Sequence, residues 1–231
     1  MKKRWIITLA LVALCGMAQA NIVYIDFGGH FSSVASSYGA AYGVTGSWNT
    51  VTAASALNLT DSAGLATDVD LQISSSGTLN LDGWTTVVTQ EGLKQLVNDN
   101  FYVNSSASWT VSLSSLSSGT YDVYVYAPAN LNIDGTGAFT VNGTAVSSIR
   151  GSESNSLIEG VNYAKIQNIT VSGGTLTLNS PADYISGNAY GLAGIQVVQT
   201  AIPEPASILM IGFGGLLITG YRRMRKSYGH F

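Results

Sequence analysis

The chain has 231 residues, with 10 Lys and Arg against 13 Asp and Glu, a net charge of −3 and a single Cys. Its charged fraction of 10% lies far below the roughly 25% of an ordinary globular domain, which argues against a basic nucleic-acid binder and against a charge-rich disordered chain. One Cys excludes an intrachain disulfide framework and a cysteine-rich zinc site.

Residues 1–20 have the layout of a secretory signal peptide. Three basic residues at positions 2–4 precede an apolar stretch that runs to Met17. The segment ends in Ala18-Gln19-Ala20, a small-residue cleavage site. We therefore expect signal peptidase to cut after Ala20, so that the mature chain begins at Asn21.

Residues 21–199 alternate apolar and polar residues in short runs, which is the period of a half-buried strand. We expect one extracytoplasmic domain, an all-β antiparallel β-sandwich of jelly-roll type with about eight to ten strands. Turn residues at Ser76-Gly77, Asn142-Gly143 and Gly173-Gly174 predict hairpins. The clearest runs are 22–27, 69–73, 109–113, 121–126, 139–141, 164–171, 175–178 and 195–198.

One segment of the body has the period of a helix. Over Glu91–Asn100, Leu93, Leu96 and Val97 fall on one face, which predicts a single short helix. Strands and helices do not alternate, and no repeat of 20 to 50 residues stands out, which argues against doubly wound folds, propellers and solenoids.

The C-terminal region, residues 200–226, combines three features. Pro203-Glu204-Pro205 precedes an uncharged apolar run at 206–221, which as a helix would measure about 24 Å against a hydrocarbon core of about 30 Å. The run predicts one short transmembrane helix, with a buried core helix as the alternative. The basic cluster that follows places the tail 227–231 in the cytoplasm and the body outside. Its members are Arg222, Arg223, Arg225 and Lys226.

Together with the signal peptide, these features resemble the PEP-CTERM sorting signal of Gram-negative envelope proteins. The resemblance covers roughly residues 201–226, and it departs from the commonest pattern only at Ile202, where Val is more usual. It implies export through the inner membrane, retention by the short helix, and recognition of Pro203, Glu204 and Pro205 by the membrane enzyme exosortase. The protein would then reach the cell surface or an extracellular biofilm matrix.

The body is similar to the galactose-binding-like jelly roll, a sandwich often found ahead of such signals. The resemblance implies a fold and no particular ligand, because its landmarks are generic strand and turn residues. They are Ile25-Asp26-Phe27-Gly28-Gly29, Trp48-Asn49-Thr50-Val51, the segment 117–126, Phe139-Thr140-Val141-Asn142-Gly143, the segment 174–178 and the segment 191–198.

The charges are unevenly distributed along the chain. All thirteen acidic residues lie between Asn21 and Pro205, where the basic residues are Lys94, Arg150 and Lys165, giving that region a net charge of −10. This excludes nucleic acid as a partner and leaves neutral glycans such as an exopolysaccharide, cations and other envelope proteins.

Carbohydrate binding is the most natural use of such a sandwich, since aromatic faces stack on sugar rings while polar groups bond the hydroxyls. Large aromatic residues also fill protein cores, which is the alternative for each candidate. The candidate glycan contacts in predicted loops are Tyr38, Tyr42, Trp48, Trp84, Tyr184 and Tyr190.

Two groups of oxygen-bearing residues are candidate Ca²⁺ ligands. Asp68 and Asp70 would share one face of a strand, where like charges either face water or bind a cation. Asn130, Asn132 and Asp134 begin like a calcium loop, although the bidentate Glu of an EF-hand is missing, and a polar turn is the alternative. Apart from Ca²⁺, we expect no cofactor.

The sequence offers little for catalysis. His30 follows the first strand in a Gly-rich turn, and neither a nucleophile elbow nor a zinc-protease motif is present. A glycoside hydrolase needs two carboxylates across a cleft, and no pair stands out in the sequence. We therefore expect a non-catalytic structural or interaction module, with a carbohydrate-binding module and, after it, a surface polysaccharide hydrolase as the alternatives.

Overall fold

The computed structural model describes residues 22–41, 45–84, 88–103, 107–127, 139–146, 149, 156–180 and 190–201. All of them belong to one compact unit, Ala20–Ala201. The described strands are β1 (Ile22–Phe27), β2 (Trp48–Val51), β3 (Ser55–Ala56), β4 (Asp70–Ser75), β5 (Leu79–Trp84), β6 (Asp99–Val103), β7 (Trp109–Ser114), β8 (Gly119–Tyr126), β9 (Phe139–Val141), β10 (Thr144–Val146), β11 (Tyr163–Val171), β12 (Leu176–Ser180), β13 (Tyr190–Leu192) and β14 (Gly194–Ala201), and the described helix is α2 (Leu93–Val97).

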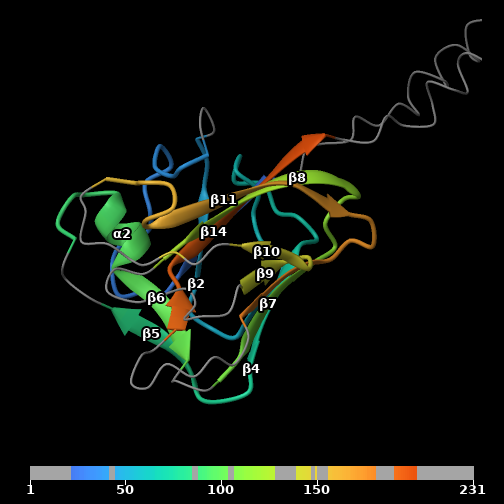
Figure 1. The fold of residues 1–231 in the computed structure, drawn as a ribbon. Coiled ribbons are helices and arrows are strands. Elements are labelled where there is room, and N and C mark those ends of the chain that lie inside the picture. The colour runs from blue at the N-terminus through green and yellow to red at the C-terminus, as the bar shows by residue number, and fades with distance from the viewer. Residues whose placement is uncertain are drawn as a thin grey trace, which may run out of the picture. The chain divides into compact units, whose positions relative to one another are not determined.

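Two large sheets and one small sheet make up the described part of the domain (Figure 1). The first has five strands in the order β11-β8-β14-β1-β2, and the second has six in the order β10-β9-β12-β7-β4-β3. A three-stranded sheet, β13-β6-β5, lies beside helix α2 (Figure 1). Paired strands run antiparallel except β1 and β2, which run parallel. This confirms the prediction of an antiparallel, β-sandwich-like all-β fold.

The core between the two large sheets follows from the period-2 alternation of the strands. On β7 the side chains alternate strictly between buried and half-buried, so that Trp109, Val111 and Leu113 point inward. They join one apolar cluster with Ile25 of β1 and Val123 of β8. Because residues from both large sheets belong to this cluster, we call the faces that meet there the inner faces.

A second apolar cluster covers the opposite, outer face of the five-stranded sheet. Tyr124 and Tyr126 of β8 pack there with Leu93 and Leu96 of α2 and with Val34. Strand β8 is therefore buried on both faces over its last six residues.

The helix predicted over Glu91–Asn100 is correct in its apolar face and too long at both ends. Leu93, Leu96 and Val97 are buried on one side of α2, as expected. At its C-terminal end, the side-chain amide of Asn98 donates to the Val88 carbonyl oxygen at 2.7 Å, and its carbonyl accepts the Val88 N–H at 3.3 Å. Asn98 thereby ties the chain back on itself, and strand β6 starts at the next residue.

Of the three predicted hairpins, one is confirmed and two are wrong. Asn142 and Gly143 both have positive φ, and they join the paired strands β9 and β10. The turn at Ser76-Gly77 instead connects β4 of the six-stranded sheet to β5 of the three-stranded sheet. Similarly, Gly173-Gly174 connects β11 of the five-stranded sheet to β12 of the six-stranded sheet. Turn residues report a reversal of direction, but not whether the next strand returns to the same sheet.

Candidate functional site

The outer face of the five-stranded sheet carries a continuous row of large polar and aromatic side chains. The strand registers place Lys165 of β11 opposite Tyr124 of β8, Tyr124 opposite Gln196 of β14, and Gln196 opposite Tyr24 of β1. Tyr24 is in turn opposite Trp48 of β2. One row therefore crosses all five strands, and we call it the first row.

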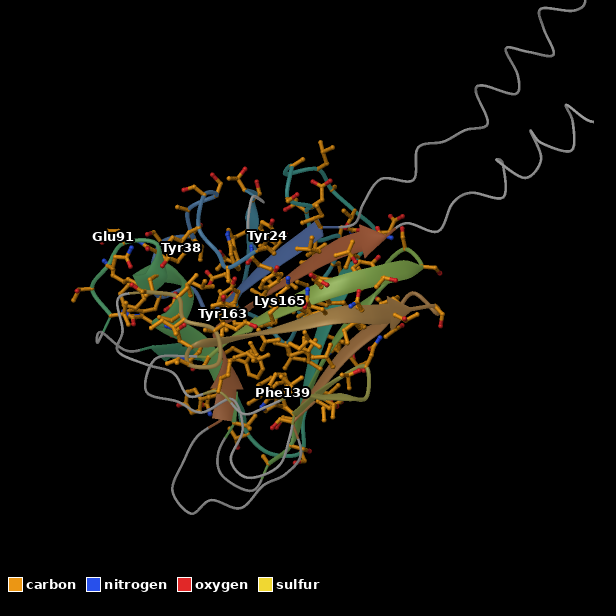
Figure 2. The ribbon with its side chains drawn as sticks, turned by 45° about the horizontal axis from the view of Figure 1, so that its top comes forward. Tyr24, Tyr38, Glu91, Phe139, Tyr163 and Lys165 are labelled. Atoms are coloured by element: carbon orange, nitrogen blue, oxygen red, sulfur yellow. The ribbon has the colours of Figure 1, made fainter. Side chains whose placement is uncertain are left out.

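A second row runs beside the first, two residues along each strand. It contains Tyr163 of β11, Tyr126 of β8, Gly194 of β14, Asp26 of β1 and Thr50 of β2. The two rows share one face because side chains two residues apart on a strand point the same way. Figure 2 labels Tyr24, Tyr163 and Lys165 on this sheet.

The aromatic rings of the two rows contact one another. The ring centroids of Tyr24 and Trp48 lie 5.3 Å apart, and those of Trp48 and Tyr126 lie 6.1 Å apart. Toward the β11 edge, the Tyr163 centroid is 6.0 Å from that of Tyr126 and 6.5 Å from that of Tyr124. These separations lie in the range of favourable aromatic pairs. We call Tyr24, Trp48, Tyr124, Tyr126 and Tyr163 the aromatic face.

The centre of this face is covered by the chain around Tyr38. The Tyr126 hydroxyl donates to Gln196 Oε1 and accepts the N–H of Ala40 at 2.6 Å. The N–H of Ala41 donates to the same Gln196 oxygen at 3.1 Å. Gly39 has a φ of +144°, which residues with a Cβ rarely adopt, and a Cβ there would lie 2.6 Å from Gln196 Nε2.

Helix α2 covers the second row. A Cβ on Gly194 would lie 2.9 Å from Leu96 Cδ1 and 2.7 Å from the Ile25 carbonyl oxygen. The missing side chain therefore makes room for Leu96 between Tyr126 and Asp26. The aromatic face is consequently buried at its centre and remains partly accessible at Tyr163 on one edge and Trp48 on the other.

A charged pair lies at the β11 edge of the aromatic face. Lys165 Nζ is 3.1 Å from Asp122 Oδ2 and 5.4 Å from the centroid of the Tyr124 ring. The side chain of Lys165 is 26% exposed and that of Asp122 is 12% exposed. The bond to Asp122 raises the pKa of Lys165, so the ammonium group stays charged at neutral pH. This edge therefore presents N–H donors and a carboxylate acceptor beside two tyrosine rings.

Tyr24, Tyr126 and Tyr163 of the face, and Tyr38 above it, keep their protons at neutral pH. Burial raises the pKa of Tyr24 to about 12 and raises that of Tyr126 further. Burial also raises the pKa of Tyr163 and Tyr38. Their hydroxyl groups are therefore neutral and can both donate and accept hydrogen bonds.

Of the predicted glycan contacts, Tyr38 and Trp48 both belong to this site. Trp48 Nε1 donates to the Tyr38 carbonyl oxygen at 3.2 Å, and both side chains are half-buried. The Tyr38 ring packs against Gly92, the residue after Glu91, and Figure 2 labels Tyr38 and Glu91 near each other. The remaining candidates, Tyr42, Trp84, Tyr184 and Tyr190, lie outside the described residues or are described there by backbone alone, in β5 and β13.

The four tyrosines Tyr24, Tyr124, Tyr126 and Tyr163 were missing from the sequence-predicted site. Each lies within a predicted strand or at its edge, where an aromatic side chain is expected to pack in the hydrophobic core. The alternation Asp122, Tyr124, Tyr126 on one strand was the available signal, since it puts three polar-tipped residues on one face.

Of the predicted calcium ligands, Asp70 has a structural role. Its Oδ1 accepts the N–H of Asn58 at 2.9 Å, where Asn58 adopts positive φ. Asp68 is exposed in the bend before β4. Asn130, Asn132 and Asp134 lie outside the described residues, and in the described part of the chain no three His, Cys, Asp or Glu side chains are grouped as metal ligands.

The predicted processing segments also lie outside the described residues. They are the signal peptide with Ala18, Ala20 and Asn21, the motif Pro203-Glu204-Pro205, the run 206–221 and the basic residues after it. Among the described residues, the one helix is too short to cross a membrane.

Comparison with known proteins gives little further information. No protein-family model matches the chain, and no curated protein is similar to it. Among solved structures, the crystal structure of protein YXIM from Bacillus subtilis is similar at 13% sequence identity and a TM-score of 0.36. The match covers 78% of this chain and 40% of that one, so the chain spans less than half the length of that protein.

Proposed function

We propose that this protein is an exported envelope protein, sorted by its PEP-CTERM signal, whose β-sandwich is a non-catalytic module that binds neutral glycans on the aromatic face. The observation that carries the binding part is the pair of side-chain rows across the five-stranded sheet. They bring Tyr163, Lys165 and Tyr124 together at one edge and place Trp48 at the other, where its indole N–H donates to the Tyr38 carbonyl oxygen.

The chemistry of the β11 edge suits a sugar. A pyranose ring stacks its apolar C–H face on an aromatic ring, while paired hydroxyls bond to a donor and an acceptor. Tyr163 is half-buried and offers a ring face, Lys165 Nζ is a donor, and the Asp122 carboxylate is an acceptor.

The charge balance favours a neutral polymer over an acidic one. Lys165 is already paired with Asp122, so it brings no uncompensated positive charge to the face. The region between Asn21 and Pro205 carries a net charge of −10, which repels polyanions at low salt. An exopolysaccharide of neutral hexoses is therefore the ligand class we assign. A jelly-roll arrangement of the sandwich, of the galactose-binding-like type, is the finer fold that we propose with it.

Glycan binding is tested by probing an array of neutral and acidic polysaccharides with the purified full-length protein. We expect retention on neutral hexose polymers, reduced at least tenfold by Tyr163→Ala. The matched control is Tyr102→Ala, which removes another half-buried tyrosine, on the three-stranded sheet. Absence of binding to every polymer, or equal loss in both variants, would overturn the glycan proposal and leave the sorting proposal untouched.

Sorting is tested separately with Glu204→Ala. If exosortase reads Pro203-Glu204-Pro205, the variant should accumulate as an uncleaved membrane form that keeps its C-terminal tail. Glu159→Ala, in the body, is the control and should be processed normally. A Glu204→Ala protein of wild-type size and location would refute the sorting proposal.

A further inference from the structure

Two buried aspartates meet where strand β1 passes strand β6. Asp26 belongs to the second row on β1, and Asp99 is the first residue of β6, immediately after α2 and its capping residue. The two strands are in close contact here: the centroids of Phe27 and Phe101 lie 4.9 Å apart, and a Cβ added to Gly28 would lie 2.7 Å from Asp99 Cβ. The residues are 73 positions apart in the sequence, which is why no pair stood out there.

One oxygen of Asp99 holds the turn that follows β1. Its Oδ2 accepts the N–H of Phe31 at 2.9 Å, and the backbone of His30 also bonds to this carboxylate. Asp99 thus ties the Gly28–Phe31 turn to the start of β6. These bonds favour the ionised form of Asp99.

One oxygen of each carboxylate is buried without a hydrogen-bond partner among the described residues. Asp26 is 1% exposed and Asp99 is fully buried. Within the described residues, neither Asp26 Oδ1 nor Asp99 Oδ1 has a hydrogen-bond partner. Two ionised carboxylates in such a place would lack both solvation and neutralisation, which is strongly unfavourable.

The charged groups around the pair offer little compensation. Burial raises the pKa of Asp99 and the charge of Asp82 on β5 adds to this, whereas the bonds from the turn and the charge of His30 lower it. On α2, Lys94 lies over the Phe31 ring at 5.7 Å, but its ammonium group is bonded to Glu91 at 2.9 Å. Along the second row, the residues that flank Asp26 are Gly194 and Thr50, neither of which carries a charge.

We propose that Asp26 and Asp99 form a proton-dependent latch that holds α2 and β6 on the five-stranded sheet. While Asp26 keeps its proton, it is neutral, Asp99 anchors the turn, and α2 covers the second row. In alkali this proton leaves Asp26, and the two negative charges push β1 and β6 apart. The latch is independent of what the aromatic face binds.

The direction of the pH dependence follows from the burial. Burial, and then the negative charge of Asp99, raise the pKa of Asp26 to about 9. In the unfolded chain an aspartate titrates near ~3.9. The stabilisation from neutral Asp26 is therefore complete below pH ~4 and is lost as the pH rises through the folded pKa. Between these limits, each pH unit lowers the folding equilibrium constant by up to about tenfold.

The test is the unfolding equilibrium of the full-length protein between pH 6 and pH 9, together with amide hydrogen exchange of residues 93–103. We expect the wild-type folding constant to fall steadily with pH, and exchange in α2 and β6 to accelerate beyond the intrinsic effect of pH. The side chain of the Asp26→Asn variant cannot ionise, so its folding constant should depend less on pH. Its melting temperature at pH 9 should be higher than that of the wild type.

Asp61→Asn is the matched control. Asp61 is also buried, but its Oδ1 accepts the N–H groups of Ala63 and Leu65, so the variant should lose stability without a change in the alkaline slope. A wild-type folding constant that does not change between pH 6 and pH 9 would by itself overturn the latch proposal. So would an unchanged slope in Asp26→Asn, or a Ca²⁺-induced rise of the melting temperature that Asp26→Asn abolishes, because the pair would then hold a cation.

Discussion

The two faces of the five-stranded sheet are built from the same strands but differ in their side-chain chemistry and in the roles that we propose for them. The inner face carries aliphatic residues such as Ile25, Val123 and Val125, which pack against the six-stranded sheet. On the outer face, the residues between them, such as Tyr24 and Tyr124, carry polar groups under a thinner cover of one short helix and one loop. The inner face needs no particular chemistry beyond shape and apolarity. The outer face contains the donors, acceptors and ring surfaces that a ligand would use.

The largest effect should come from the inner face. Ile25 is fully buried between the sheets, so Ile25→Ala removes three buried carbons and leaves a cavity. We expect a loss of about 2 to 5 kcal/mol in the free energy of unfolding. Denaturant titration measures it, and a loss below about 1 kcal/mol would mean that the inner face does not dominate stability.

The next effect should come from closing the space under α2. Gly194→Ala places a Cβ against Leu96 and the Ile25 carbonyl oxygen, which should cost about 1 to 3 kcal/mol. Gly173→Ala is the control, because a Cβ there meets nothing within 4 Å. If both variants have the same melting temperature, Leu96 of α2 does not pack closely against Gly194.

Two buried tyrosines allow the faces to be compared with the same chemical change. Tyr126→Phe on the outer face removes the hydroxyl that bonds both Gln196 and Ala40, and should cost about 1 to 3 kcal/mol. Tyr121 on the inner face bonds the Ser117 carbonyl oxygen at 2.6 Å, and Tyr121→Phe should cost about 1 kcal/mol. Limited proteolysis near Ala40 should accelerate in Tyr126→Phe alone; equal cleavage would contradict the role of this hydroxyl in holding the loop.

The smallest effect on stability should come from the charged pair at the β11 edge. Lys165→Ala breaks a partly exposed salt bridge, which is worth about 0 to 1 kcal/mol. Its melting temperature should therefore lie close to that of the wild type, whereas retention on a neutral polysaccharide should weaken severalfold. Unchanged retention would show that Lys165 takes no part in binding the polysaccharide.

Period-2 alternation was enough to predict the class of the fold and most of the long strands. It reports which residues alternate and which face each one shares. The helical spacing of Leu93, Leu96 and Val97 located α2 by its apolar face. It could not predict the order of the strands in each sheet. Ser76-Gly77 therefore read as a hairpin although its two strands belong to different sheets.

The site was predictable only in part, for the same reason. Tyr38 and Trp48 stood out because each is an aromatic residue in a segment that reads as loop. Tyr163, Tyr124 and Tyr24 come from strands far apart in the sequence, and only the register aligns them. The closeness of Asp26 to Asp99 likewise depends on how β6 packs against β1, which no local pattern contains.

Side-chain footprinting of the tyrosines and tryptophans, with and without a bound neutral polysaccharide, tests most directly the claim that the outer face binds the ligand. Bound polymer should protect Tyr163 and Trp48 from modification, while Tyr102 and the buried Trp109 remain unchanged. Equal modification of Tyr163 and Trp48 in the free and bound protein would contradict the claim that the outer face is the binding surface.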